Sequence, residues 1–136
     1  QIDNVIENAL IMADEKQIRQ ACGNLIKNSH ENITLNKIRN GKISIIFGVE
    51  VDLVSITIND NGTGIDKSMI SKITEPYYTT KTGNSGLGLA ITKKIIDDHN
   101  GTILFKPIKN SQGTSVILKF PIMTKSNNEK KINVKK

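Results

Sequence analysis

The feature that most constrains this sequence is the segment Asp60–Ile65, which reads Asp-Asn-Gly-Thr-Gly-Ile. It follows residues 54–59, where apolar side chains occupy every second position, as in a half-buried strand. A carboxylate at a strand end is thus followed by two glycines, which let the backbone turn sharply and approach a ligand closely. Alone, the segment is equally compatible with an ordinary Asn-Gly turn. A helix with asparagines upstream and Gly86–Leu89 downstream favour a nucleotide site instead.

The distribution of charge argues against a nucleic-acid-binding protein. The net charge is +6, but residues 124–136 hold five lysines against one glutamate, so the other 123 residues carry only +2. No aromatic platform or arginine cluster accompanies this charge. We therefore predict one domain over residues 1–123 and a basic, disordered tail over 124–136, with no nucleic-acid partner.

The cysteine content and hydropathy bear on the compartment. Cys22 is the only cysteine and cannot form an internal disulfide, which fits a reducing environment. No apolar run approaches the roughly 20 residues that cross a bilayer, and the first residues do not resemble a signal peptide. We expect a soluble, cytoplasmic chain that makes no membrane contact of its own.

A long helix is predicted after Asp14, which has the character of an N-cap with Gln17 completing a capping box. One face of this helix recurs at helical spacing through Ile18, Cys22, Leu25 and then Ser29 or Ile33. A second stripe, at four-residue steps, consists of Gln20, Asn24 and Asn28. Because asparagine is a weak helix former, two of them in mid-helix cost local stability.

The remaining elements predict an α/β fold. An edge strand within 1–13 and an antiparallel hairpin of strands at 42–47 and 53–59 are expected, then a short helix from Asp66 to about Ile73. A helix from about Gly86 to His99, with Leu87, Ala90, Ile91 and Ile95 inward, ends at Asn100-Gly101. Strands at 102–105 and 114–120 follow. We predict a two-layer α/β sandwich with a mostly antiparallel sheet of about five strands packed on about three helices.

Several polar residues have chemistry suited to a nucleotide. Asn28 offers a neutral oxygen of the kind that magnesium prefers, although without other motifs it is more typical of an exposed helix face. Gly86–Gly88 at a helix start could cradle phosphate, and Lys81 in the Gly-bearing loop 77–86 could meet phosphate oxygens. Asp60 could accept a hydrogen bond from an exocyclic amine, which distinguishes adenine from guanine.

Four motifs in this order resemble the catalytic, ATP-binding domain of sensor histidine kinases, which shares the Bergerat (GHKL) fold with type II topoisomerases, Hsp90 and MutL. Asn24–Asn28 matches the asparagine box, Asp60–Ile65 the first glycine box, Glu75–Lys81 the phenylalanine-box region and Ser85–Ala90 the second glycine box. Gly113-Thr114 matches the small pair before the last strand. The sequences of the phenylalanine-box region and the second glycine box are most similar to those of the NtrY/NtrB-like nitrogen-regulation kinases.

The resemblance implies roles for individual residues in binding Mg-ATP. Asn28 would ligate Mg²⁺ with Asn24 beside it, and Asp60 would bind the adenine amino group, assisted through water by Thr114. Asn24, Asn28 and Lys81 are the expected catalytic residues. The expected nucleotide-binding residues, which include the ATP lid and the glycines of both boxes, are Asn24, Asn28, Asp60, Gly62, Gly64, Ile65, Tyr78, Thr79, Thr80, Lys81, Gly86, Leu87, Gly88, Leu89 and Thr114.

The sequence also departs from the family pattern. Asn84 and Asn100 stand where glycine is usual, and asparagine tolerates a left-handed backbone best among the other residues. Ser29 and His30 stand where small and apolar residues are usual. No helical hairpin with a phosphoacceptor histidine is visible, and His30 and His99 have the character of ordinary histidines. We expect a fragment whose phosphoacceptor domain lies upstream, in a membrane-anchored parent that signals onward to a response regulator.

Two alternatives remain open. Hydrolytic ATPases of the topoisomerase or Hsp90 type resemble this chain but carry a glutamate one turn before the magnesium asparagine. That position is Asn24, which cannot accept a proton at neutral pH, so efficient hydrolysis is disfavoured. The substitutions at Ser29, His30 and Asn84 leave open a non-catalytic module that binds a nucleotide or a partner protein.

Overall fold

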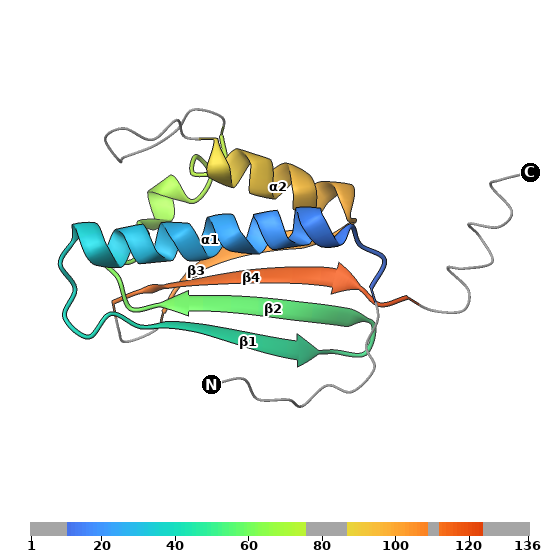
Figure 1. Cartoon of the computed structure of the whole chain (residues 1–136), viewed down its shortest axis with the longest axis horizontal. Helices are drawn as coiled ribbons and strands as arrows, with labels where there is room; N and C mark the ends of the chain where they lie inside the picture. Colours follow the sequence, from blue (N-terminus) through green and yellow to red (C-terminus); the bar gives the residue numbers. More distant parts are fainter. Residues whose placement is uncertain (1–10, 76–86, 109–111, 124–136) are drawn as a thin grey trace, which may run out of the picture.

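The computed structural model describes residues 11–75, 87–108 and 112–123, and these form two layers. Helices α1 and α2 lie side by side over one face of a four-stranded sheet (Figure 1). The bounds of the elements are α1 Glu15–Leu35, β1 Ile43–Val49, β2 Leu53–Asp60, the 3₁₀ helix η1 Lys67–Met69, α2 Gly88–Asp98, β3 Thr102–Pro107 and β4 Thr114–Pro121. The predicted α/β sandwich is thereby confirmed.

The strand order is β1-β2-β4-β3, and every neighbouring pair is antiparallel. The register places Asp60, the last residue of β2, opposite Ile43 of β1 and Thr114 of β4. The start of β1, the end of β2 and the start of β4 therefore meet at one end of the sheet. The predicted hairpin of β1 and β2 is confirmed, with β1 extending two residues further than expected.

Helix α1 begins at the predicted N-cap. The Asp14 carboxylate accepts a hydrogen bond from the backbone N–H of Gln17 at 3.1 Å. The reciprocal half of the capping box is made differently, because the N–H of Asp14 donates to Nε2 of His99 at 3.0 Å. Since Nε2 accepts this bond, the ring carries its proton on Nδ1, which lies 2.7 Å from the carbonyl of Ile95. His99 thus joins the end of α2 to the start of α1.

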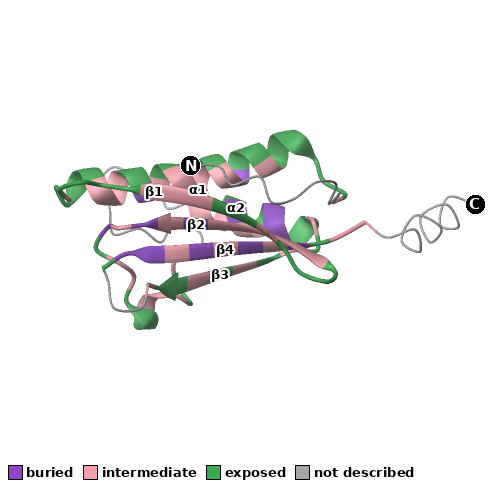
Figure 2. Ribbon diagram, turned by 90° about the horizontal axis from the view of Figure 1, so that it is seen from below, coloured by how far each residue is buried: buried purple, intermediate pink, exposed green. Residues whose placement is uncertain are grey.

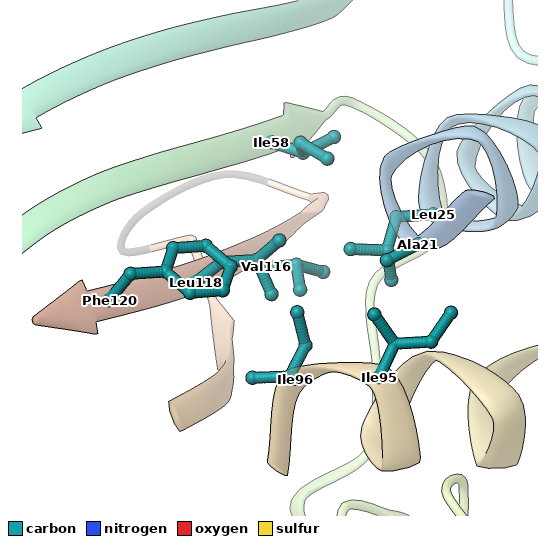
Figure 3. Close-up of a cluster of buried hydrophobic side chains, with 8 residues drawn as sticks. All are labelled: Ala21, Leu25, Ile58, Ile95, Ile96, Val116, Leu118 and Phe120. Atoms are coloured by element: carbon teal, nitrogen blue, oxygen red, sulfur yellow. The ribbon is translucent and has the colours of Figure 1, made fainter. Parts of the chain in front are cut away.

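The core lies between the helices and the sheet, where eight apolar side chains point toward one another (Figure 3). Strand β4 contributes three of them, more than any other element, and its residues alternate between buried and half-buried along most of the strand (Figure 2). This alternation follows from the two-residue period of a strand with one face on the helices. The core residues are Ala21, Leu25, Ile58, Ile95, Ile96, Val116, Leu118 and Phe120.

Three details differ from the sequence prediction. The described residues contain four strands. Of the segment 1–13, in which an edge strand was predicted, residues 1–10 lie outside the described part and residues 11–13 are not in a strand. The helix predicted at 66–73 is only the short η1 followed by turns, and η1 buries none of its residues. So short a segment lacks the packing that sustains an α-helix.

The buried face of α2 is also rotated from the predicted one. Ile95 is buried as predicted, but the other buried residues are Thr92 and Ile96, whereas Ile91 is 40% exposed. Burial of Thr92 is possible because its hydroxyl donates to the carbonyl of Gly88 one turn earlier, which satisfies the polar group inside the helix.

Replacing Leu118 by alanine tests the position of the core. Leu118 is fully buried on β4, so Leu118→Ala should lower the free energy of unfolding by about 2–5 kcal/mol. Leu104 on the neighbouring strand β3 is 41% exposed, and Leu104→Ala should cost less than about 1 kcal/mol. Chemical denaturation of the two variants measures the difference, and equal losses would contradict this placement of the core.

Candidate functional site

The carboxylate of Asp60 is buried at the end of β2 and held through both oxygens. Only 7% of the residue is exposed. Its Oδ1 accepts from the backbone N–H of Gly62 at 2.9 Å, and its Oδ2 accepts from the hydroxyl of Ser29 on α1 at 3.0 Å. A carboxylate has about four acceptor positions, so these bonds leave acceptor capacity for a ligand. The aspartate is thus fixed in place by its own turn and by a helix.

The turn after Asp60 is tied to two other elements by asparagine side chains. Oδ1 of Asn32 on α1 accepts from the N–H of Thr63 at 2.9 Å, and its amide nitrogen donates to the Thr63 hydroxyl at 3.2 Å. The Asn61 side chain accepts from the N–H of Lys42 at 2.6 Å and donates to the carbonyl of Asn40 at 2.9 Å. These contacts hold the turn against α1 and the loop before β1.

Glycine is required at this end of the sheet by close approach and by backbone geometry. A Cβ on Gly62 would overlap the side-chain amide of Asn32. Gly64 and Gly113 have φ angles of +85° and +138°, in the range that favours glycine. A Cβ on Gly113 would overlap the carbonyl of Asp60. The end of β2 and the start of β4 therefore pack backbone to backbone.

The start of α2 is positioned by Asn24 of α1. The Asn24 amide nitrogen donates to the carbonyl of Gly88 at 3.2 Å and to the hydroxyl of Thr92 at 3.3 Å. Leu87, at the N-cap position, supplies no side-chain hydrogen bond to the helix. Among the described residues, no side-chain cap for the first N–H groups of α2 comes from the N-cap position, and such a helix start favours an anion.

Helix α1 brings the end of β2 and the start of α2 to the same end of the molecule. Asn24 contacts Gly88 and Ser29 contacts Asp60. The two α1 residues are five positions apart, which corresponds to roughly 7.5 Å along a helix. Asn28 lies between them, one turn beyond Asn24.

The other residues predicted for the site divide into three groups. Thr114 is buried opposite Asp60, and Ile65 follows the glycine turn. Leu87 and Leu89 flank Gly88 at the start of α2. The predicted residues that lie outside the described part of the chain are Tyr78, Thr79, Thr80, Lys81 and Gly86.

No role at this site was predicted for Asn32 or Asn61. Ser29 was predicted as a possible member of the face of α1 that carries Leu25, which its burial confirms, and as a departure from the family pattern. Helical spacing could have indicated these residues, because Asn32 lies one turn after Asn28 and Ser29 lies five residues after Asn24. Their partners on the glycine turn are about 30 residues away, and such contacts cannot be inferred from local periodicity.

Two further features lie apart from these groups. A hollow of about 650 Å³ opens at the other end of β4, lined in part by Met12, His99 and Phe120, and none of the predicted site residues that the structure describes lines it. Burial raises the pKa of the Cys22 thiol, so the cysteine stays protonated and is a poor nucleophile.

Among residues 11–75, 87–108 and 112–123, no helix combines the length and the hydrophobicity of a membrane-spanning segment.

Comparison with known proteins identifies the class. Residues 13–124 match the family described as histidine kinase-, DNA gyrase B- and HSP90-like ATPase, and the chain belongs to this family. Sporulation kinase B of Bacillus subtilis is 40% identical over 112 residues, which are 82% of this chain and 25% of that protein. A Rickettsia conorii protein, whose name describes an NtrY-like sensor histidine kinase, is 37% identical over 86% of this chain and 19% of its own length.

Solved structures agree with this assignment. The nucleotide-free catalytic domain of histidine kinase ThkA superposes with a TM-score of 0.74 at 33% identity, over 86% of this chain and 75% of that one. Full-length ShkA shares the fold, with a TM-score of 0.72 at 23% identity, over 86% of this chain and 24% of that one. The chain is an ATP-binding catalytic module of the sensor histidine kinase kind, as the resemblance implied, and it spans a quarter or less of the two curated relatives.

Proposed function

We propose that this module binds Mg-ATP and donates the γ-phosphate to a histidine on a separate dimerisation domain of the same parent protein. The observation that carries the proposal is the meeting of Asp60, the asparagines of α1 and the start of α2 at one end of the fold. The domain would comprise residues 1–123, with 124–136 as a tail. The match to the family over residues 13–124 supports this division.

Asp60 would bind the base. Its carboxylate is buried and retains acceptor capacity beyond the bonds from Ser29 and Gly62, so it suits the exocyclic amine of adenine. Gly62, Gly64 and Ile65 would shape the pocket, and Thr114 would assist Asp60 through a water molecule. The close backbone packing of Gly64 against Gly113 supports a preformed site.

The phosphates would lie toward the start of α2, where Leu87 supplies no side-chain cap and the first N–H groups of the helix favour an anion. Gly86, Leu87, Gly88 and Leu89 would support them. Asn28 would hold Mg²⁺ through its amide oxygen. A single asparagine oxygen is compatible with Mg²⁺, because this cation keeps several waters and takes few protein ligands. The described residues contain no group of three or more histidine, cysteine, aspartate or glutamate side chains that could hold a metal ion. Bound magnesium would neutralise part of the negative charge of the phosphates. Lys81 and the lid residues Tyr78–Thr80 would complete the site.

Catalysis by this chain would consist of binding, orienting and shielding the triphosphate, because phosphoryl transfer depends mainly on positioning and electrostatics. The nucleophile would be the imidazole of the dimerisation domain. The relatives are four or more times longer than the matched region, which leaves room for that domain. We propose a cytoplasmic location for the module in a membrane-anchored parent, with a response regulator as the downstream partner.

Hydrolysis of ATP is the competing function, and the contacts of Asn24 argue against it. Its amide nitrogen is engaged with Gly88 and Thr92, so the residue acts in holding α2. An amide also cannot accept a proton from water at neutral pH.

The balance between transfer and hydrolysis is directly testable. The isolated chain should bind Mg-ATP, release phosphate negligibly in the steady state, and phosphorylate a histidine-bearing dimerisation domain added in trans. Radiolabelled ATP measures both reactions. Fast phosphate release would favour the hydrolytic ATPase, and binding without transfer to any such domain would favour the non-catalytic module.

Asp60→Asn tests the base pocket. The substitution turns a pure acceptor into a mixed donor and acceptor facing the adenine amine, so ATP affinity should fall by about tenfold or more. Asp52→Asn, in the exposed β1–β2 turn, is the matched control and should leave affinity unchanged. Calorimetric titration measures both variants. An unchanged affinity in Asp60→Asn would mean that the base binds elsewhere.

Gly88→Ala separates binding from folding. A methyl group added to Gly88 or to Gly23 would meet no described atom of another element within 4 Å. Alanine should therefore raise helix stability by up to about 1 kcal/mol at Gly23, inside α1, and by less at Gly88, the first residue of α2. Only Gly88→Ala should weaken Mg-ATP binding, because its methyl group would stand where the phosphates approach the backbone. Thermal unfolding and titration are measured on each variant. Equal Mg-ATP affinities of the Gly88→Ala and Gly23→Ala variants would mean that the phosphates do not bind at the start of α2.

A further inference from the structure

The hydroxyl of Ser29 occupies an unusual place beside the carboxylate of Asp60. Ser29 is 5% exposed, and its Oγ donates to Oδ2 of Asp60 at 3.0 Å. An ionised carboxylate only accepts hydrogen bonds, so the serine must be the donor. The proton of Ser29 is therefore committed to Asp60, and the lone pairs of Oγ remain as a second acceptor next to the carboxylate.

This contact fixes the orientation of the aspartate. Gly62 N–H holds Oδ1, and the Ser29 hydroxyl holds the other oxygen. A side chain without a polar atom at position 29 would remove the donor that α1 supplies to Oδ2, and the carboxylate would lose its hold at that end. A buried charge with fewer donors is more costly and more free to rotate.

We propose that Ser29 is a positioning residue that sets the preference of the base pocket for a 6-aminopurine over a 6-oxopurine. The inference rests on the proposed function of Asp60 as the group that binds the base. Adenine presents an amine donor at position 6, whereas guanine presents a carbonyl acceptor there. With Asp60 fixed and the Ser29 proton committed to it, these two side chains present only acceptors to the base, so they attract the amine and repel the carbonyl.

The test compares nucleotides that differ only at position 6 of the purine. In the full chain, Ser29→Ala should weaken binding of Mg-ATP about tenfold, the usual effect of losing one hydrogen bond to a charged group. Binding of purine riboside triphosphate, which lacks the amine, should change less than about twofold, because that ligand cannot use Asp60 as an acceptor. The ratio of ATP to GTP affinity should fall in parallel.

Two variants accompany this measurement. Ser29→Cys keeps a weak donor of similar size and should lose less ATP affinity than Ser29→Ala. Ser44→Ala, on the face of β1 turned away from the core, should change none of the affinities. Alanine is the best helix former, so Ser29→Ala is compatible with an intact α1, and circular dichroism checks this.

The possible results distinguish a failure of the role of Ser29 from a failure of the proposed Mg-ATP binding. Loss of ATP affinity with retention of affinity for the analogue supports the role of Ser29. An equal loss of affinity for both ligands would mean that Ser29 contributes only to packing, and this would overturn the proposal. An unchanged affinity for ATP would overturn it as well. If the wild-type chain does not bind ATP at all, the proposed function itself fails.

Discussion

The structure depends on a buried negative charge at the end of β2. Burying a carboxylate is costly unless donors surround it, and Asp60 has donors from two directions, Ser29 and Gly62. The first requires α1 to lie close over the end of β2, and the second requires the sharp turn that follows. The need for glycine at Gly113 has a separate cause at the same residue, because a Cβ there would overlap the backbone carbonyl of Asp60. The Asp60 side chain thereby joins a helix to the turn after β2, and the Asp60 backbone lies against the residue that precedes β4.

Helix α1 extends this constraint across the molecule. Its first turn is joined to the end of α2 through Asp14 and His99, and its middle holds the start of α2 through Asn24. The two helices are therefore antiparallel, with the apolar core beneath them (Figure 3). Because both ends of α2 are held by α1, the helix start at Gly88 has a defined position relative to Asp60. A nucleotide site assembled from separate elements needs this kind of rigid support.

Much of this could be predicted from local sequence. The N-cap at Asp14, the β1–β2 hairpin and the placement of Asp60 at a strand end follow from short-range patterns. Asn100, which stands where the family has glycine, has a φ of +55°, as expected for asparagine in that role. The contacts of Ser29 and Asn32 could not be predicted, because they join residues about 30 positions apart. The rotated face of α2 was missed for a related reason, since tertiary packing outweighs periodicity in a short helix.

The central claim is that groups from α1, β2 and α2 bind one nucleotide together. Chemical-shift mapping by two-dimensional nitrogen–proton NMR, with a non-hydrolysable ATP analogue and magnesium, tests this most directly. The account predicts simultaneous, saturable shifts of the backbone amides of Gly62 and Gly88 and of the side-chain amides of Asn24 and Asn28. Shifts confined to the opposite end of the sheet, around His99 and Met123, would contradict it.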